Sequence, residues 1–146
     1  MGDLIDLILF LLAIAAGYFS GSWVEKKHYQ SIREREKKLA YLPVVTSENL
    51  LDKNLTVKGA HFVSGNVVIS TDYFKLIFSG LRSILGGRIS AYETLIDRAR
   101  REAILRLKEK AQGADIILNL RIETSLVTQI GSVEAFAFGT AVYYEK

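Results

Sequence analysis

The chain has 146 residues, 49% hydrophobic and 24% charged, a composition that suits one globular domain with a short addition. It contains no cysteine and only two histidines. Disulfides, thiolate metal sites, thiol catalysis and a multi-histidine metal cage within one chain are therefore excluded. A net charge of +3 is too small to indicate nucleic-acid binding, so we expect no nucleic-acid partner. We also expect no cofactor.

Residues 1–24 predict a transmembrane anchor. The run from Leu7 to Val24 has 18 residues without a charge, close to the ~20 that a helix needs to cross the hydrocarbon core. Trp23 lies near the end of the run, where amphipathic rings favour the headgroup layer. A cleaved signal peptide fits less well, because two aspartates and no Lys or Arg precede the apolar run.

Residues 25–40 predict a charged juxtamembrane helix, with six basic and three acidic residues. Excess Lys and Arg after a span predict a single-pass inner-membrane protein with its N-terminus outside and its C-terminal domain in the cytoplasm. Tyr29, Ile32 and Leu39 form an incomplete apolar seam, with Glu36 at an apolar position. Two interpretations stay open: a coiled stem between chains, or a solvated stalk that contacts anionic lipid.

Small residues share one face of the expected span. Ala13, Gly17 and Gly21 follow one another at four-residue intervals, a spacing that lets membrane helices approach closely. Glycine is also common in such helices, so the pattern favours self-association only slightly. A pore is the third functional alternative, because several anchors at the axis of a ring could surround a channel. It ranks last, since the span has few polar residues to line one.

Residues 41–146 predict an α+β domain. The expected elements are strands at 41–46, 55–63 and 67–70, a short helix at 72–85, a long helix at 90–112, and strands at 116–124 and 133–144. Ser64-Gly65-Asn66 is expected to form a turn. Ser90 and Glu93 form a capping-box pair at the start of the long helix, and Gly113 is expected to end it.

The long helix has one apolar face at helical spacing. That face comprises Tyr92, Leu95, Ile96, Ala99, Ala103, Leu107 and Ala111. Arg98, Arg101 and Lys108 lie off this face, and we expect them in solvent or at a subunit contact.

The last strand alternates small and large residues. One face offers Ala135, Ala137, Gly139 and Ala141 for close helix packing, and the other offers Phe136, Phe138, Val142 and Tyr144. One long helix cannot cover both faces, so Phe136, Phe138 and Tyr144 are the expected interface of a homo-oligomer. Alternatively, the short helix or the N-terminal strand covers the aromatic face within one chain.

The chain resembles the YbjQ-like family, a group labelled heavy-metal-binding. The resemblance spans roughly residues 43–144. It is carried by Gly87-Arg88-Ile89-Ser90-Ala91-Tyr92-Glu93, Ala99-Arg100, Ala103 with Leu107, Gly113-Ala114-Asp115-Ile116-Ile117 and Gly139-Thr140-Ala141-Val142. Ser64-Gly65 looks like the family's turn before the short helix. The resemblance implies a dodecin-subunit-like antiparallel sheet with helices on one side, and a ring of subunits, a pentamer. It supplies no catalytic residues.

Metal binding has one weak candidate ligand in the domain, His61, because His28 lies in the stalk and no thiolate is present. A strand histidine is more often simply hydrogen-bonded. Arg88, Tyr92 and Glu93 are candidates for a ligand or an intersubunit contact. The glycines before Arg88 could hold a phosphate at a helix N-terminus. A structural role explains them better, because they lie where one expected helix ends and the next begins.

Three functions follow as hypotheses. The first is a membrane-anchored, ring-forming module without enzyme activity, which acts as a cytoplasmic scaffold or binding platform. The second is a ligand or heavy-metal sensor with a site between subunits, and the third is the oligomeric pore. The expected partners are membrane lipid and further copies of the chain.

Overall fold

The structure is a computed structural model and describes residues 2–47, 49, 54–70, 90–128 and 131–145. The elements of this part are helices α1 (Gly2–Lys38) and α3 (Ser90–Lys110) and strands β1 (Val57–Ser70), β2 (Ile116–Thr128) and β3 (Ser132–Tyr144). The predicted α+β class with an antiparallel sheet is confirmed. The predicted helix at 72–85 and its end at Gly86-Gly87 lie outside the described residues.

The three strands form one antiparallel sheet in the order β1-β3-β2. The alternating strand β3 therefore lies in the centre and pairs with both neighbours. The strand predicted at 41–46 is reduced to a single parallel bridge between Val44 and Ile117. The backbone N–H of Ile117 donates to the Pro43 carbonyl at 2.9 Å, so this segment lies along the edge of β2.

The predicted turn at Ser64-Gly65-Asn66 is wrong, because these residues lie inside the continuous strand β1. The glycine has a different purpose. A Cβ at Gly65 would lie 2.2 Å from the Ala103 carbonyl oxygen and 2.5 Å from the Leu107 nitrogen. Glycine in a strand often marks such a close backbone approach. Here it lets α3 cross β1 in direct contact.

Helix α3 begins at Ser90 as predicted and ends at Lys110, followed by Gly113 with φ +79°. Its apolar face is buried against the sheet. The buried side chains of the two layers include Leu95, Ala99, Ala103, Leu107 and Ala111 from α3 and Val133, Ala135, Ala137 and Ala141 from β3. The small β3 residues bring the helix close to the sheet, as the alternation predicts.

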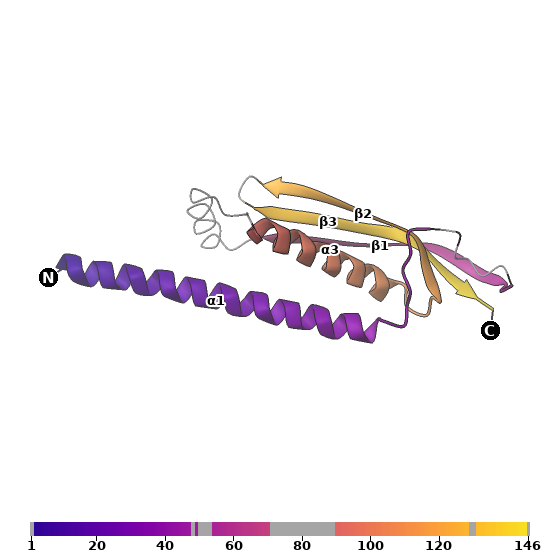
Figure 1. Cartoon of the computed structure of the whole chain (residues 1–146), viewed down its shortest axis with the longest axis horizontal. Helices are drawn as coiled ribbons and strands as arrows, with labels where there is room; N and C mark the ends of the chain where they lie inside the picture. The colour runs from indigo at the N-terminus through magenta and orange to yellow at the C-terminus, as the bar shows by residue number, and fades with distance from the viewer. Residues whose placement is uncertain (1, 48, 50–53, 71–89, 129–130, 146) are drawn as a thin grey trace.

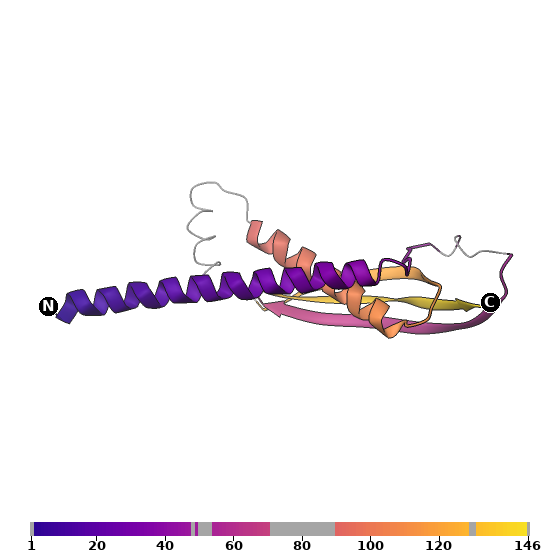
Figure 2. The same cartoon turned by 90° about the horizontal axis from the view of Figure 1, so that it is seen from below.

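Helix α1 runs without a break and forms a third layer beside α3, on the side away from the sheet (Figures 1 and 2). Its N-terminal half extends beyond the rest of the domain (Figure 1). Within the described residues it is the one helix long and apolar enough to cross a membrane, and its apolar window is unburied. The predicted helix at 25–40 is thus the direct continuation of the apolar helix.

Candidate functional site

The C-terminal half of α1 is docked on α3. Tyr29 donates its hydroxyl to the Thr94 carbonyl at 3.0 Å, and Arg101 donates two hydrogen bonds to Glu36 at 2.8 and 2.7 Å. Ile32, between these contacts on α1, is fully buried. The contacts advance in the same order along both helices, so α1 and α3 run in the same direction.

The docking changes the interpretation of the seam on α1. Its positions face α3 of the same chain: Ile32 is fully buried, whereas Tyr29, Glu36 and Leu39 stay partly exposed. Glu36, which interrupts the apolar seam, pairs with Arg101. The hydrogen bonds with this arginine hold the pKa of Glu36 below its ordinary value.

The expectation that three basic residues of α3 face solvent or another subunit is also corrected. The Arg98 guanidinium lies 6.0 Å from the centre of the Tyr29 ring, a cation–π geometry. Lys108 donates from Nζ to the Leu39 carbonyl at 3.1 Å. With Arg101, these residues form the α3 side of the docking interface.

A buried carboxylate lies at the centre of this interface. Glu102 is 3% exposed, the one charged residue enclosed to this degree in the described part of the chain. It accepts hydrogen bonds from Arg35 and, at 3.0 Å, from Nε of Arg106. Arg35 also donates to Glu109 at 3.2 Å. Two guanidinium groups thus compensate one buried negative charge.

The protonation states follow from these contacts. Burial alone would raise the pKa of Glu102, but the hydrogen bonds from Arg35 and Arg106 lower it below its ordinary value. The imidazole Nε2 of His28 lies 3.6 Å from the same carboxylate. Burial lowers the pKa of His28 despite that carboxylate, with nearby arginines adding to the effect. An ionised glutamate beside a neutral histidine is the favoured state.

The sheet face opposite α3 carries an aromatic cluster. Phe62 on β1 is 70% exposed and Phe136 on β3 is 37% exposed. The Phe138 ring lies between them, with centroid distances of 6.2 Å to Phe62 and 5.4 Å to Phe136. The predicted aromatic face of β3 is therefore present in part: Phe136 is open to solvent and Phe138 is half-buried, but Val142, predicted on the same face, is 3% exposed. Tyr144 lies at the far end of that strand, half-buried, and its backbone N–H donates to Asp115 at 2.9 Å.

Phe62 was not predicted from the sequence as a member of this cluster. The register pairs it with Thr140, so it faces the same side as Phe138 on the neighbouring strand. A two-residue alternation through positions 57–70 could have found it, but the turn expected at Ser64-Gly65-Asn66 interrupted that pattern.

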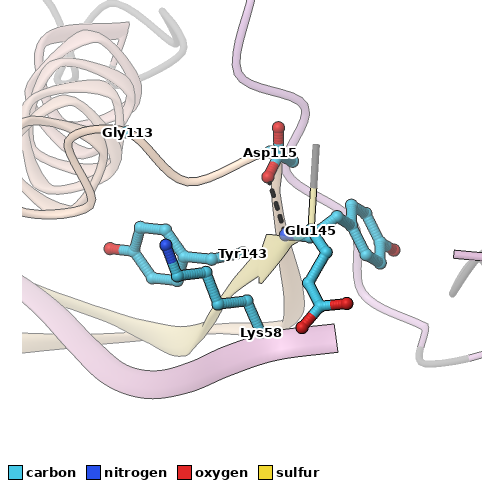
Figure 3. A pocket seen from close by; sticks show the side chains of 6 residues that line it. Lys58, Gly113, Asp115, Tyr143 and Glu145 are labelled. Carbon is cyan, nitrogen blue, oxygen red and sulfur yellow. Dashed lines mark hydrogen bonds between the residues drawn. The ribbon is translucent and has the colours of Figure 1, made fainter. Parts of the chain in front are cut away.

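An open hollow of about 570 Å³ lies at the end of the sheet where β3 finishes (Figure 3). It is lined by Lys58, Gly113, Asp115, Tyr143, Tyr144 and Glu145. The carboxylates of Asp115 and Glu145 do not point toward each other (Figure 3). Among the described residues, no three His, Asp or Glu side chains form a group suited to a metal ion.

The predicted metal candidate His61 lies next to this hollow. Its ring packs edge-on against Tyr143 at 5.7 Å between centroids. A histidine on an aromatic ring fits a packing role, and its part in metal binding stays a prediction.

The remaining candidates are only partly placed. Arg88 and the side chain of Tyr92 lie outside the described residues, and Glu93 is exposed in the first turn of α3. Ala13, Gly17 and Gly21 lie on the apolar part of α1. Their packing in a membrane stays a prediction.

The geometry thus defines a small α+β domain with an open aromatic face, docked on a long N-terminal helix. We call the contacts of Tyr29, Arg35 and Glu36 on α1 with Thr94, Glu102 and Arg101 on α3 the clamp. Residues 42–145 match the family YbjQ_1, described as "Putative heavy-metal-binding", and the chain belongs to this family. The UPF0145 protein of Hahella chejuensis is 38% identical over 104 residues, which cover 70% of this chain and 98% of that protein. The UPF0145 protein of Methanosarcina acetivorans is 37% identical over 101 residues, with 68% and 93% coverage.

A crystal structure of a protein of unknown function from Pediococcus pentosaceus, assigned to the DUF74 family, is also similar. It is 16% identical, with a TM-score of 0.40 and coverage of 71% of this chain and 98% of that one. The match to the family begins after α1.

Proposed function

We propose that this chain is a membrane-anchored member of its family, which holds a ring of domains at the cytoplasmic face of the inner membrane. In this proposal the ring is a non-enzymatic scaffold or binding platform. The observation that carries the proposal is the continuous helix α1: its first part is apolar and unburied, and its second part is clamped to the family domain.

The contacts between α1 and α3 support a rigid connection between the apolar run and the family domain. Tyr29, Ile32 and Glu36 all contact or pack toward α3, and these residues directly follow the apolar run. Cleavage within that run would leave the docked part of α1 in place. The stalk is therefore part of the domain's own structure, and it joins the domain to the apolar segment without a flexible linker.

The open aromatic face supports self-association. Phe62 and Phe136 expose large apolar rings on a sheet face whose opposite side is already covered by α3. Contiguous exposed apolar surface is typical of interaction sites. We propose that the partner is a second copy of the chain, which its own anchor holds at the same height above the membrane. The proposed assembly is a pentameric ring.

Ligand sensing is the second candidate function. The open hollow lined by Lys58, Asp115 and Glu145 favours it, because it offers both signs of charge at one end of the domain. Such a hollow suits a small charged ligand, and a neighbouring subunit would complete the site. Isothermal titration of the oligomer with divalent metals and phosphate tests this role.

Membrane fractionation and reporter fusions test the main proposal. The full chain should stay in the membrane fraction after an alkaline wash. A periplasm-active reporter fused after Lys146 should be silent, while a cytoplasm-active one should be active. The double variant Ile14→Lys with Ala16→Lys should release the protein, since each Lys at the centre of a membrane helix costs about 2.5–3.5 kcal/mol. The control Ser22→Lys lies at the end of the apolar run and should leave it anchored.

An active periplasmic reporter would overturn the orientation. Recovery of the unaltered chain in the washed soluble fraction would overturn anchoring altogether.

A further inference from the structure

The clamp between α1 and α3 fixes the height of the whole domain above the membrane that α1 would span. Val24 is the last residue of the uncharged run, and Tyr29, which bonds to Thr94, follows five residues later. At 1.5 Å per residue, Thr94 lies about 7–8 Å beyond the level of Val24. The start of α3 is therefore close to the lipid surface.

The same end of the sheet also lies near this level. Strand β1 contacts α3 at Gly65, against Ala103 and Leu107, and then runs five more residues to Ser70. That stretch covers about 16 Å. The helix covers a similar length from this contact back to Thr94, and the end of β1 lies beside the start of α3 (Figures 1 and 2).

The ends of the other two strands meet there. Ser70 pairs with Ser132 at the start of β3, and Ser132 pairs with Thr128 at the end of β2. The three strands thus finish together, within roughly 8 Å of the level of Val24. The headgroup layer outside the hydrocarbon core is about 5–8 Å thick on each side. The end of the sheet is therefore at the depth of the lipid headgroups.

Two neighbouring apolar side chains are exposed at this end. Leu126 is 67% exposed and Val127 is 50% exposed, and both lie among the last residues of β2, which ends at Thr128. Lys26 and Lys27 on α1 are near the same level and are suited to lipid phosphates. Apolar tips beside cations are typical of a protein surface that meets a membrane interface.

We propose that Leu126 and Val127 insert into the headgroup layer of the bilayer that α1 spans. This inference rests on the proposed membrane anchoring. It adds a second point of membrane contact, on the opposite side of α3 from the anchor. Since the domain is already fixed to α1, the second contact limits the tilt of helix and domain together, so every copy in a membrane would take the same tilt.

The native chain has no cysteine, so single cysteines can report the depth of chosen positions. The full chain would be placed in vesicles of phosphatidylcholine and phosphatidylglycerol, with an environment-sensitive fluorophore on Val127→Cys. The matched control is Val57→Cys, a valine of similar exposure, 44%, at the opposite end of the sheet. Val24→Cys reports whether α1 is inserted.

Nitroxide-labelled lipid headgroups should quench the fluorophore at residue 127 nearly as strongly as at residue 24, and should leave residue 57 unquenched. Quenching at 24 but not at 127 would overturn the tip contact while the anchor stands. Equal quenching at 127 and 57 would also overturn it. No quenching at any of the three would refute the anchoring itself, a result distinct from the other two.

A charge-swap experiment distinguishes a membrane contact that depends on the docking of α1 on α3 from non-specific adsorption of Leu126 and Val127 to lipid. Arg101→Glu should loosen the docking against Glu36 and reduce the quenching at residue 127, while residue 24 stays quenched. Adding Glu36→Arg should restore it. Quenching at 127 that is indifferent to both changes would contradict the proposed geometry.

Discussion

Glu102→Gln should destabilise the docking of α1 more than any neutralisation of an exposed carboxylate. The carboxylate of Glu102 is 3% exposed and accepts hydrogen bonds from Arg35 and Arg106. Glutamine keeps the shape but removes the negative charge. Two guanidinium groups are then left facing a neutral amide that can satisfy only one of them well.

The magnitude follows from the exposure of the two partners. Losing one partner of a fully buried ion pair costs about 3–5 kcal/mol. Arg35 and Arg106 keep 25% and 47% of their side-chain surface exposed, so water compensates part of the loss. Arg35 also retains Glu109. We therefore expect a loss of about 2–3 kcal/mol, near the value of a charged hydrogen bond.

Thermal unfolding of the full chain in a mild detergent measures this loss. At about 4 °C per kcal/mol for a chain of this size, Glu102→Gln should lower Tm by roughly 8–12 °C. The matched control Glu123→Gln is on the exposed part of β2 and should change stability by less than about 0.5 kcal/mol. Trypsin should also cut the stalk faster in Glu102→Gln. Equal Tm values for the two variants would refute the view that Glu102 holds the clamp.

Four further predictions follow. Gly65→Ala should cost about 3 kcal/mol or more in unfolding free energy, because the added Cβ meets the backbone of α3, while Gly59→Ala should cost far less. Because burial lowers the pKa of His28, stability should be full above its ordinary value of 6.5 and should fall as the pH drops below it; unfolding of His28→Gln should be less sensitive to pH in that range. Phe138→Asp should split the oligomer in light scattering, since each buried aromatic side chain contributes roughly 1.5–3 kcal/mol; an oligomer of unchanged mass would contradict the proposed interface. Calorimetry should show no tight zinc or copper binding, and sub-micromolar binding lost in His61→Ala would overturn that expectation.

Local pattern was enough to predict the main elements. The capping residues placed the start of α3 at Ser90, and Gly113 marked its end with a positive φ. The small and large alternation in β3 predicted which face α3 would cover. These features depend on neighbours a few residues apart, which a single sequence displays directly.

The misreadings came from contacts between distant segments. Gly65 is a turn residue by local rules, and only the crossing of α3 explains it inside a strand. Glu36 breaks an apolar seam until Arg101, 65 positions later, is placed beside it. The predicted aromatic face lacked Phe62 for the same reason, because placing Phe62 beside Phe138 requires the register of β1 against β3. No spacing rule connects such positions before the chain is folded.

The shared long direction of α1 and the sheet also bears on how copies would meet. Because the strands run along the direction of α1 (Figure 1), the open face with Phe62 and Phe136 would look sideways, within the plane of a membrane that α1 spans. Copies anchored in one bilayer share their height and orientation, so their aromatic faces can meet without tilting. Confinement also raises their effective concentration, which favours association beyond what the contact alone provides. The rigid contact between α1 and α3 at Glu102 therefore matters more in an anchored protein than in a free domain. It fixes the orientation of the exposed sheet face, so that this face is directed toward neighbouring copies in the same membrane.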